Sequence, residues 1–179
     1  MLGKSELLGK ASLGCGAGAN SAATSNSCGL PDCLARLIAG FEPVAPCTFQ
    51  STIQGGTATA AVCYANGSTS VFSSSTTPPA AGQTSTTKQT YWKSGALLFS
   101  VESTTVNDGS SPVSSIYRDS TGEEVASSTI GVGSSKIAVT CTGGAPTTID
   151  AACWLSKIVG PLDDTGMGTQ NCTQGTCAP

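Results

Sequence analysis

Cysteine is the residue type with the clearest chemical meaning in this sequence. Nine cysteines occur in 179 residues, and the chain contains no histidine. Thiolates could bind zinc, but zinc sites use close CxxC pairs, often completed by histidine, whereas the closest spacing here is C-x4-C. We therefore expect disulfide bonds, which form in the periplasm, at the cell surface or in the medium. The candidate disulfide residues are Cys28, Cys33, Cys47, Cys63, Cys141, Cys153, Cys172 and Cys177.

The ninth cysteine, Cys15, lies among small residues in the segment 11–18. Small residues before a cysteine and a Gly/Ala-rich stretch after it are typical of the lipid-modified cysteine of bacterial lipoproteins, so Cys15 is the candidate for lipidation. Met1–Gly14 fits a signal peptide poorly, because it contains two lysines and a glutamate and lacks a long apolar run. The alternative is a free or intermolecular thiol at Cys15.

Few other residues could perform catalysis. Without histidine, Ser-His-Asp triads and Cys-His dyads are excluded. A glycosidase pair could draw on Glu102, Asp119, Glu123 and Glu124, but the last three flank a glycine turn, where acids are ordinarily solvated. Ser85-Thr-Thr-Lys88 fits the S-x-x-K pattern of Ser-Lys enzymes, but it precedes a predicted strand, and that chemistry needs a helix. We therefore expect no enzymatic activity and no cofactor.

Calcium is the ion that the remaining side-chain oxygens fit best. The segment Asp163–Asn171 combines carboxylates and glycines as hard-cation loops do, but it lacks the EF-hand spacing. Because acid–glycine segments are ordinarily turns, we expect no metal site. N-glycosylation sequons begin at Asn66 and Asn171, and the Ser/Thr-rich segment 68–87 is a candidate for O-linked sugar.

The composition is small and polar rather than charged. Charged residues make up 11% of the chain, against roughly 25% in typical soluble domains. Ser and Thr together number 49, and the net charge is −3. An acidic balance of this kind gives no reason to expect a nucleic-acid partner. No segment approaches 18 consecutive apolar residues, so we expect no transmembrane span.

Two segments show helical periodicity. The first helix is predicted near 31–40, and its apolar residues share one face: Leu30, Leu34, Leu37, Ile38 and Phe41. Pro31 and Asp32 suit its first turn. The second is predicted near 150–159, with Thr148 as its cap and an apolar face at Ala151, Leu155, Ile158 and Val159.

The region between these helices has the pattern of antiparallel strands. Gly55-Gly56 and Asn66-Gly67 are two-residue hairpin signals, and further turns are predicted at Ser94-Gly95 and Ser120–Gly122. The segment 76–87 is predicted as a loop. The predicted strands are 48–54, 57–64, 68–75, 90–93, 96–103, 113–119, 123–130 and a last one over 137–141. The fold class expected is mainly β: an antiparallel β-meander, as a single sheet or small sandwich, with two short flanking helices stapled by disulfides.

The domain organisation follows from composition. Residues 1–29 are low in complexity and are predicted to be a flexible tether, and 30–179 to be a single disulfide-rich β domain. A Pro-rich return after the first helix suggests a Cys33–Cys47 disulfide, which is one of 105 complete pairings of eight cysteines.

Three motifs resemble uncharacterised small cysteine-rich secreted proteins and lipoproteins of Gram-negative bacteria. They are Cys28-Gly-Leu-Pro-Asp-Cys33, Pro43-x-x-Pro-Cys47 and Val62-Cys-Tyr-Ala-Asn-Gly67. The resemblance implies an extracellular, cell-surface or periplasmic location. We expect a secreted or surface-anchored, non-catalytic interaction module whose partner is a protein or a surface glycan. The alternative is a small secreted inhibitor or toxin-like protein. An exposed loop flanked by a disulfide would favour the inhibitor, and a sheet face with exposed Tyr64, Tyr91 or Trp92 would favour the module.

Overall fold

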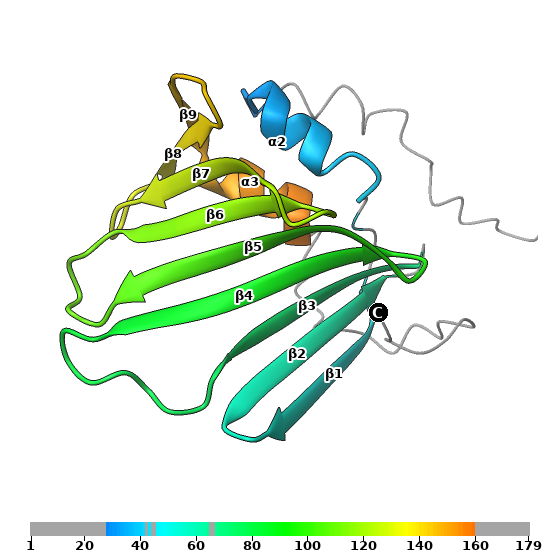
Figure 1. Cartoon of the computed structure of the whole chain (residues 1–179), viewed down its shortest axis with the longest axis vertical. Helices are drawn as coiled ribbons and strands as arrows, with labels where there is room; N and C mark the ends of the chain where they lie inside the picture. The colour runs from blue at the N-terminus through cyan, green and yellow to red at the C-terminus, as the bar shows by residue number, and fades with distance from the viewer. Residues whose placement is uncertain (1–27, 42, 44–45, 65–66, 160–179) are drawn as a thin grey trace, which may run out of the picture.

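The computed structural model describes residues 28–41, 43, 46–64 and 67–159, and for 46–50 and 159 it describes the backbone alone. This part of the chain is mainly β, and each strand pairs antiparallel with its sequence neighbours in one meander sheet (Figure 1). The predicted fold class is confirmed, in its single-sheet form. The elements are α2 (Asp32–Leu37), β1 (Pro46–Gln54), β2 (Thr57–Tyr64), β3 (Ser68–Ser75), β4 (Thr84–Lys93), β5 (Ala96–Val106), β6 (Val113–Asp119), β7 (Glu124–Ile130), β8 (Lys136–Cys141), β9 (Pro146–Asp150) and α3 (Ala151–Val159).

Two of the tight hairpins have the backbone that their sequences predict. Gly55 and Gly56 connect β1 to β2 with φ of 55° and 78°. Ser94 and Gly95 connect β4 to β5 with φ of 50° and 82°. Positive φ at both central residues is typical of the type I′ turn, whose twist matches that of the two strands it joins. Glycine adopts a positive φ without steric cost. Both predicted turns are confirmed.

Two polar stretches form strands that the sequence pattern does not predict. β4 begins at Thr84, so the loop before it is 76–83 rather than 76–87. β9 extends the sheet beyond 141, where the last strand was predicted to end. Thr84–Thr87 pairs in register with β5, and β9 pairs in register with β8. Strand formation in these segments depends on the neighbouring strand, which an alternation pattern within one segment does not report.

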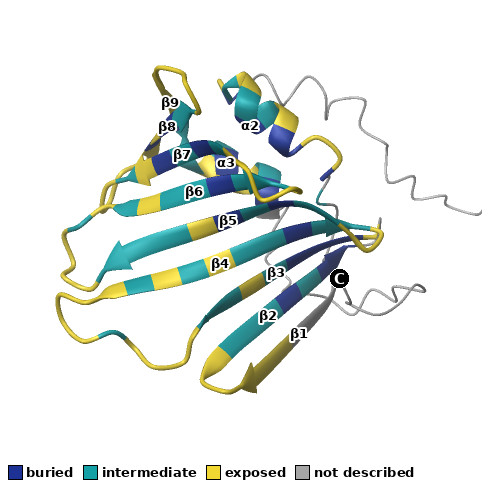
Figure 2. Cartoon of the chain, in the orientation of Figure 1, coloured by how far each residue is buried: buried dark blue, intermediate teal, exposed yellow. Residues whose placement is uncertain are grey.

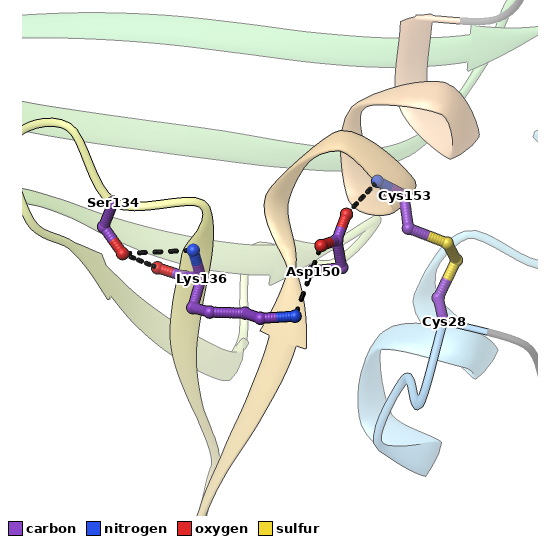
Figure 3. Close-up of polar contacts among 5 residues, drawn as sticks. All are labelled: Cys28, Ser134, Lys136, Asp150 and Cys153. Carbon is purple, nitrogen blue, oxygen red and sulfur yellow. Dashed lines mark hydrogen bonds and ion pairs between the residues drawn. A yellow bond between two sulfur atoms is a disulfide. The ribbon is translucent and has the colours of Figure 1, made fainter.

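The two helices lie where the periodicity predicts them, with corrected ends. α2 ends at Leu37 instead of near 40, and Gly40 follows with φ of 90°. The predicted cap of the second helix, Thr148, is wrong because Thr148 belongs to β9. Instead the Asp150 side chain accepts a hydrogen bond from the Cys153 backbone N–H at 2.9 Å, which satisfies one of the unpaired donors at the start of α3 (Figure 3).

The core lies between the two helices and one face of the sheet, which we call the inner face. Tyr91 stacks on Phe99 with ring centroids 4.2 Å apart, and Phe41, just after α2, packs edge-on against both rings. Trp154 of α3 packs edge-on against Tyr117 of β6. Figure 2 shows the buried residues concentrated on the strands toward the helices. The buried cluster comprises Leu34, Leu37, Ile38, Phe41, Tyr64, Tyr91, Phe99, Val101, Tyr117, Ala126, Ile137, Val139, Ile149, Trp154 and Ile158.

Two disulfides fasten the helices. Cys28 bonds to Cys153 of α3, and Cys33 of α2 bonds to Cys141 at the end of β8. Figure 3 shows the first of these bonds. The predicted Cys33–Cys47 bond is therefore wrong: α2 packs on β7, so its cysteine meets the neighbouring strand β8 and not the start of β1. Cys63 in β2 is also disulfide-bonded.

The first disulfide also moves the predicted domain boundary. Cys28 is buried and bonded to α3, so the folded part of the chain includes the last two residues of the predicted tether 1–29. The rest of that tether, 1–27, lies outside the described residues, as does the end of the predicted domain from 160 onward.

Candidate interaction surfaces

The side of the sheet opposite the core, which we call the outer face, carries a row of side chains that crosses all nine strands. Residues directly opposite each other in an antiparallel pair lie on the same face of the sheet. Glu102 and Ile116 are such a pair, and each is the sequence neighbour of a core residue, Val101 and Tyr117. Because successive side chains alternate between faces, this row points away from the core. The long row consists of Thr52, Thr59, Ser73, Lys88, Glu102, Ile116, Ser127, Thr140 and Pro146.

A second row, which we call the hydroxyl row, runs beside the long row on the outer face. Its members lie two residues away along each strand: Thr86, Thr104, Ser114, Thr129, Ala138 and Thr148. Neighbouring strands are about 4.8 Å apart and residues two apart along a strand are about 6.7 Å apart. The two rows therefore present a grid of mainly uncharged hydrogen-bonding groups at the surface.

Both described helices leave the outer face uncovered. The buried residues of α2 and α3 all belong to the core cluster on the inner face. Most members of the hydroxyl row are exposed, including Thr86, Ser114 and Thr129. Among the described elements, then, this part of the outer face has no packing partner.

Of the three aromatic residues whose exposure would favour an interaction module, Tyr64, Tyr91 and Trp92, one lies on the outer face. Trp92 is half-buried there, and its indole N–H donates to the Thr90 hydroxyl at 2.9 Å. Tyr64 and Tyr91 lie in the core, where burial raises the pKa of both hydroxyls. These two residues therefore give no support to the interaction module, because both lie on the inner face of the sheet.

Three loops at one end of the sheet surround a pocket with a volume of about 350 Å³. Asn107 fixes two of these loops to each other: its side-chain amide donates to the Pro79 carbonyl at 2.7 Å, its backbone N–H donates to Gln83, and its carbonyl accepts from Gly82. The pocket has a largely apolar lining with hydroxyl and amide groups among its residues. It is formed by Pro79, Ser85, Thr105, Val106, Asn107, Gly109, Ser111, Val113 and Val132.

Carboxylates stabilise the turns instead of converging on one point. Asp108 accepts hydrogen bonds from the backbone N–H groups of Ser110 and Ser111 and from the Ser111 hydroxyl, and these bonds lower its pKa to about 2. Asp119 accepts from the hydroxyl and backbone N–H of Thr121 and from the Glu123 N–H, so its pKa is also lowered. These hydrogen bonds stabilise both turns.

The residues weighed for catalysis do not come together. Ser85 lies on the inner face of β4 and Lys88 on its outer face, because three positions along a strand reverse the direction of the side chain. Glu102 lies on the outer face, opposite Lys88, whereas Asp119, Glu123 and Glu124 lie at or beside the β6–β7 turn. Among the residues that the structure describes, no group of three acids or cysteines could hold a metal ion.

Several candidates from the sequence lie outside the described residues. They are the lipidation candidate Cys15, the disulfide candidates Cys172 and Cys177, the acidic segment 163–171, and the sequon residues Asn66 and Asn171. Cys47 is described by its backbone alone. Within 28–159, apart from the gaps, no helix is long and apolar enough to span a bilayer.

Comparisons with protein-family models, with curated proteins and with solved structures found no match to this chain. The resemblance of the cysteine motifs to small secreted proteins therefore stays a prediction. The site residues that sequence reasoning missed are those of the hydroxyl row and Asn107. The row depends on strand register, which no local motif reports. The residues Asn107-Asp108-Gly109 are typical of a turn, but that pattern does not indicate that Asn107 anchors a second loop.

Proposed function

We propose that this protein is a secreted or surface-anchored, non-catalytic interaction module that binds its partner through the outer face of its sheet. The location is supported by the disulfides of α2 and α3, since such bonds persist in oxidising compartments. The exposed part of the outer face, at the hydroxyl row, is the observation that supports the binding role. On β2 the same face is buried at Ala61 and Cys63.

The chemistry of this face favours a neutral glycan as the partner. Hydroxyl groups both donate and accept hydrogen bonds, and the hydroxyl row presents one on each of β4, β5, β6, β7 and β9, with Ala138 in the β8 position. The half-buried Trp92 adds an aromatic surface on the same face. Lys88 and Glu102 oppose each other within the long row, so their charges offset locally. A repeating polyhydroxylated chain matches such a surface better than a strongly charged ligand does.

The test is binding of the purified full chain to immobilised neutral polysaccharides, with cellulose, chitin and an α-glucan as the probes. A triple variant, Thr104→Ala with Ser114→Ala and Thr129→Ala, removes central hydroxyls of the row and should weaken retention. The matched control changes three exposed hydroxyl residues elsewhere: Ser120→Ala, Ser135→Ala and Thr147→Ala.

The proposal is supported when the outer-face variant is retained more weakly than the wild type and the control variant is retained equally well. Equal retention of both variants, or no retention of the wild-type chain on any of the three polysaccharides, contradicts a neutral glycan as the partner. Cleavage of a polysaccharide during the incubation contradicts the non-catalytic role.

The inhibitor or toxin-like alternative draws support from the loop end. The β5–β6 turn is stabilised by hydrogen bonds of Asp108 and Asn107, and the inhibitor hypothesis requires a well-ordered, exposed loop. The two disulfides with described partners lie at the helices and do not flank this loop. Protease activity assayed with and without the wild-type chain, and then with Asp108→Ala, tests this alternative. Inhibition that the variant abolishes would favour it over the outer-face module.

A further inference from the structure

Strand β1 forms one edge of the sheet and pairs with β2 alone among the described strands. Its residues Ser51, Thr52, Ile53 and Gln54 are all exposed, and Ile53 is 77% exposed. A sheet edge carries unpaired backbone N–H and C=O groups, and these form a template for another strand. In Figure 1 this edge faces away from both helices.

The hairpin geometry shows which backbone groups of β1 are available. In a two-residue hairpin the residues that flank the turn, here Gln54 and Thr57, form a hydrogen-bonded pair. Pairing then alternates, so Thr52 bonds to Thr59 of β2, while the N–H and C=O groups of Ser51 and Ile53 point outward.

Natural sheet edges are ordinarily protected by charged side chains, by proline or by very short strands. No Asp, Glu, Lys or Arg occurs anywhere from Pro43 to Thr87, a stretch that contains all of β1, β2 and β3. β1 spans nine residues, and its proline stands at the first position, which leaves 47–54 free of proline.

The opposite edge has the protection that β1 lacks. β9 is five residues long and begins with Pro146, which has no N–H to donate. Its last residue, Asp150, forms an ion pair with Lys136 at 3.3 Å, and α3 follows at once (Figure 3). Among the residues that the structure describes, such protection is present at the β9 edge and absent from the β1 edge.

We propose that two copies of this chain associate through antiparallel pairing of their β1 edges about a two-fold axis. An antiparallel strand pair is self-complementary, because each copy offers the same groups to the other in reverse order. Each copy carries a net charge of −3. Pairing through β1 joins the uncharged strands and keeps the charged residues of β4 to α3 on the far side of each copy.

The occupant proposed for the β1 edge is a second copy of this chain. Pairing of β1 with β9 of a neighbour would be head-to-tail, and such contacts continue into filaments instead of closing. The outcomes differ in mass: the proposed arrangement stops at two copies, whereas head-to-tail pairing gives a series of increasing size.

The experiment measures the mass of the full chain by sedimentation velocity over a wide range of concentrations. Ile53→Lys places a positive charge on the paired segment of each copy, so that two like charges are brought close together in the dimer. We expect the dissociation constant to rise by more than about tenfold, because the change occurs twice in each dimer. Val132→Lys makes the same replacement at another highly exposed apolar residue, in the β7–β8 loop, and should leave the dimer intact.

A second variant tests the backbone hydrogen bonds directly. Ser51→Pro removes an outward N–H while leaving the bonds between β1 and β2 in place, a position where edge strands tolerate proline. Circular dichroism checks that each variant keeps its sheet. We expect Ser51→Pro to be monomeric at concentrations where the wild type is dimeric.

Three results would overturn the proposal. The first is a wild type that stays monomeric, or grows beyond two copies, over the whole range. The second is a dimer that Ile53→Lys and Ser51→Pro leave unchanged. The third is a dimer that persists on denaturing, non-reducing electrophoresis, because the odd number of cysteines allows an intermolecular disulfide. None of these results bears on glycan binding by the outer face.

Discussion

Reduction of the disulfides should remove most of the stability of this protein. The Cys28–Cys153 bond spans 125 residues, and in the chain-entropy treatment closing a loop of that length contributes about 5 kcal/mol. The Cys33–Cys141 bond spans 108 residues but is nested inside the first. Once the outer bond is closed, the remaining path between Cys33 and Cys141 is the difference between the two spans, 17 residues. The inner bond then adds about 3 kcal/mol.

The sum for these two bonds, about 8 kcal/mol, is comparable with the whole net stability of an ordinary domain, roughly 5–15 kcal/mol. Reduction also breaks the disulfide of Cys63, which this sum leaves out. For a chain of this size each kcal/mol corresponds to about 2–4 °C in Tm, so we expect a fall of roughly 15–30 °C or complete loss of folding. The assay is a thermal melt followed by circular dichroism, with and without dithiothreitol. The double variants Cys28→Ser/Cys153→Ser and Cys33→Ser/Cys141→Ser, made separately, should each lose less than the reduced wild type.

The control is a metal chelator, which should leave the melt unchanged because the cysteines are bonded to each other. An unchanged melt in dithiothreitol together with a collapsed melt in the chelator would refute the disulfide reasoning and the oxidising compartment inferred from it.

Three further predictions concern the core and the turns. Tyr91→Phe should leave the free energy of unfolding unchanged or raise it by about 1–2 kcal/mol, because the buried Tyr91 hydroxyl has no hydrogen-bond partner among the described residues. A loss measured by urea denaturation would contradict this. Leu34→Ala should cost about 2–5 kcal/mol, since Leu34 is fully buried on α2. Leu155→Ala, at a residue that is 53% exposed on α3, is the matched control, and equal losses would contradict the core assignment. Asp108, Asp119 and Asp150 have pKa values lowered by their hydrogen bonds, so their stabilisation is present above the unfolded pKa and is lost as the pH falls through the folded pKa. The urea midpoint should therefore drop between about pH 4 and about pH 2, and a midpoint that rises over this interval would contradict it.

Much of the sheet could be predicted because short-range signals coincide in this sequence. Glycine pairs and apolar alternation together locate β2 and β3 to the residue, and they locate β6 as well. The start of β4 and all of β9 could not be predicted in this way, since Thr-rich stretches have no apolar face of their own. Their assignment as strands depends on partners in β5 and β8.

The disulfides and the outer face could not be predicted for a different reason. Cys33 and Cys141 meet because α2 folds back over β7, a contact between segments 108 residues apart that leaves no trace in local spacing. The hydroxyl row likewise exists because six strands hold one register. A shift of one residue in any strand would move its member of the row to the core side.

The meander order of the strands has a consequence for the order of events while the chain is being made. Each hairpin is complete as soon as its second strand has emerged, so the sheet can grow in the direction of synthesis, beginning with β1 and β2. The disulfides of the helices cannot form in this order, because the bond of Cys28 requires that Cys153 has already been synthesised. During that wait Cys28 and Cys33 lie only five residues apart, and each is the nearest thiol available to the other. Early oxidation thus favours a short local loop that must later be broken by thiol–disulfide exchange. The native bonds of Cys28 and Cys33 can therefore form only after α3 and β8, which carry their partners, have been made.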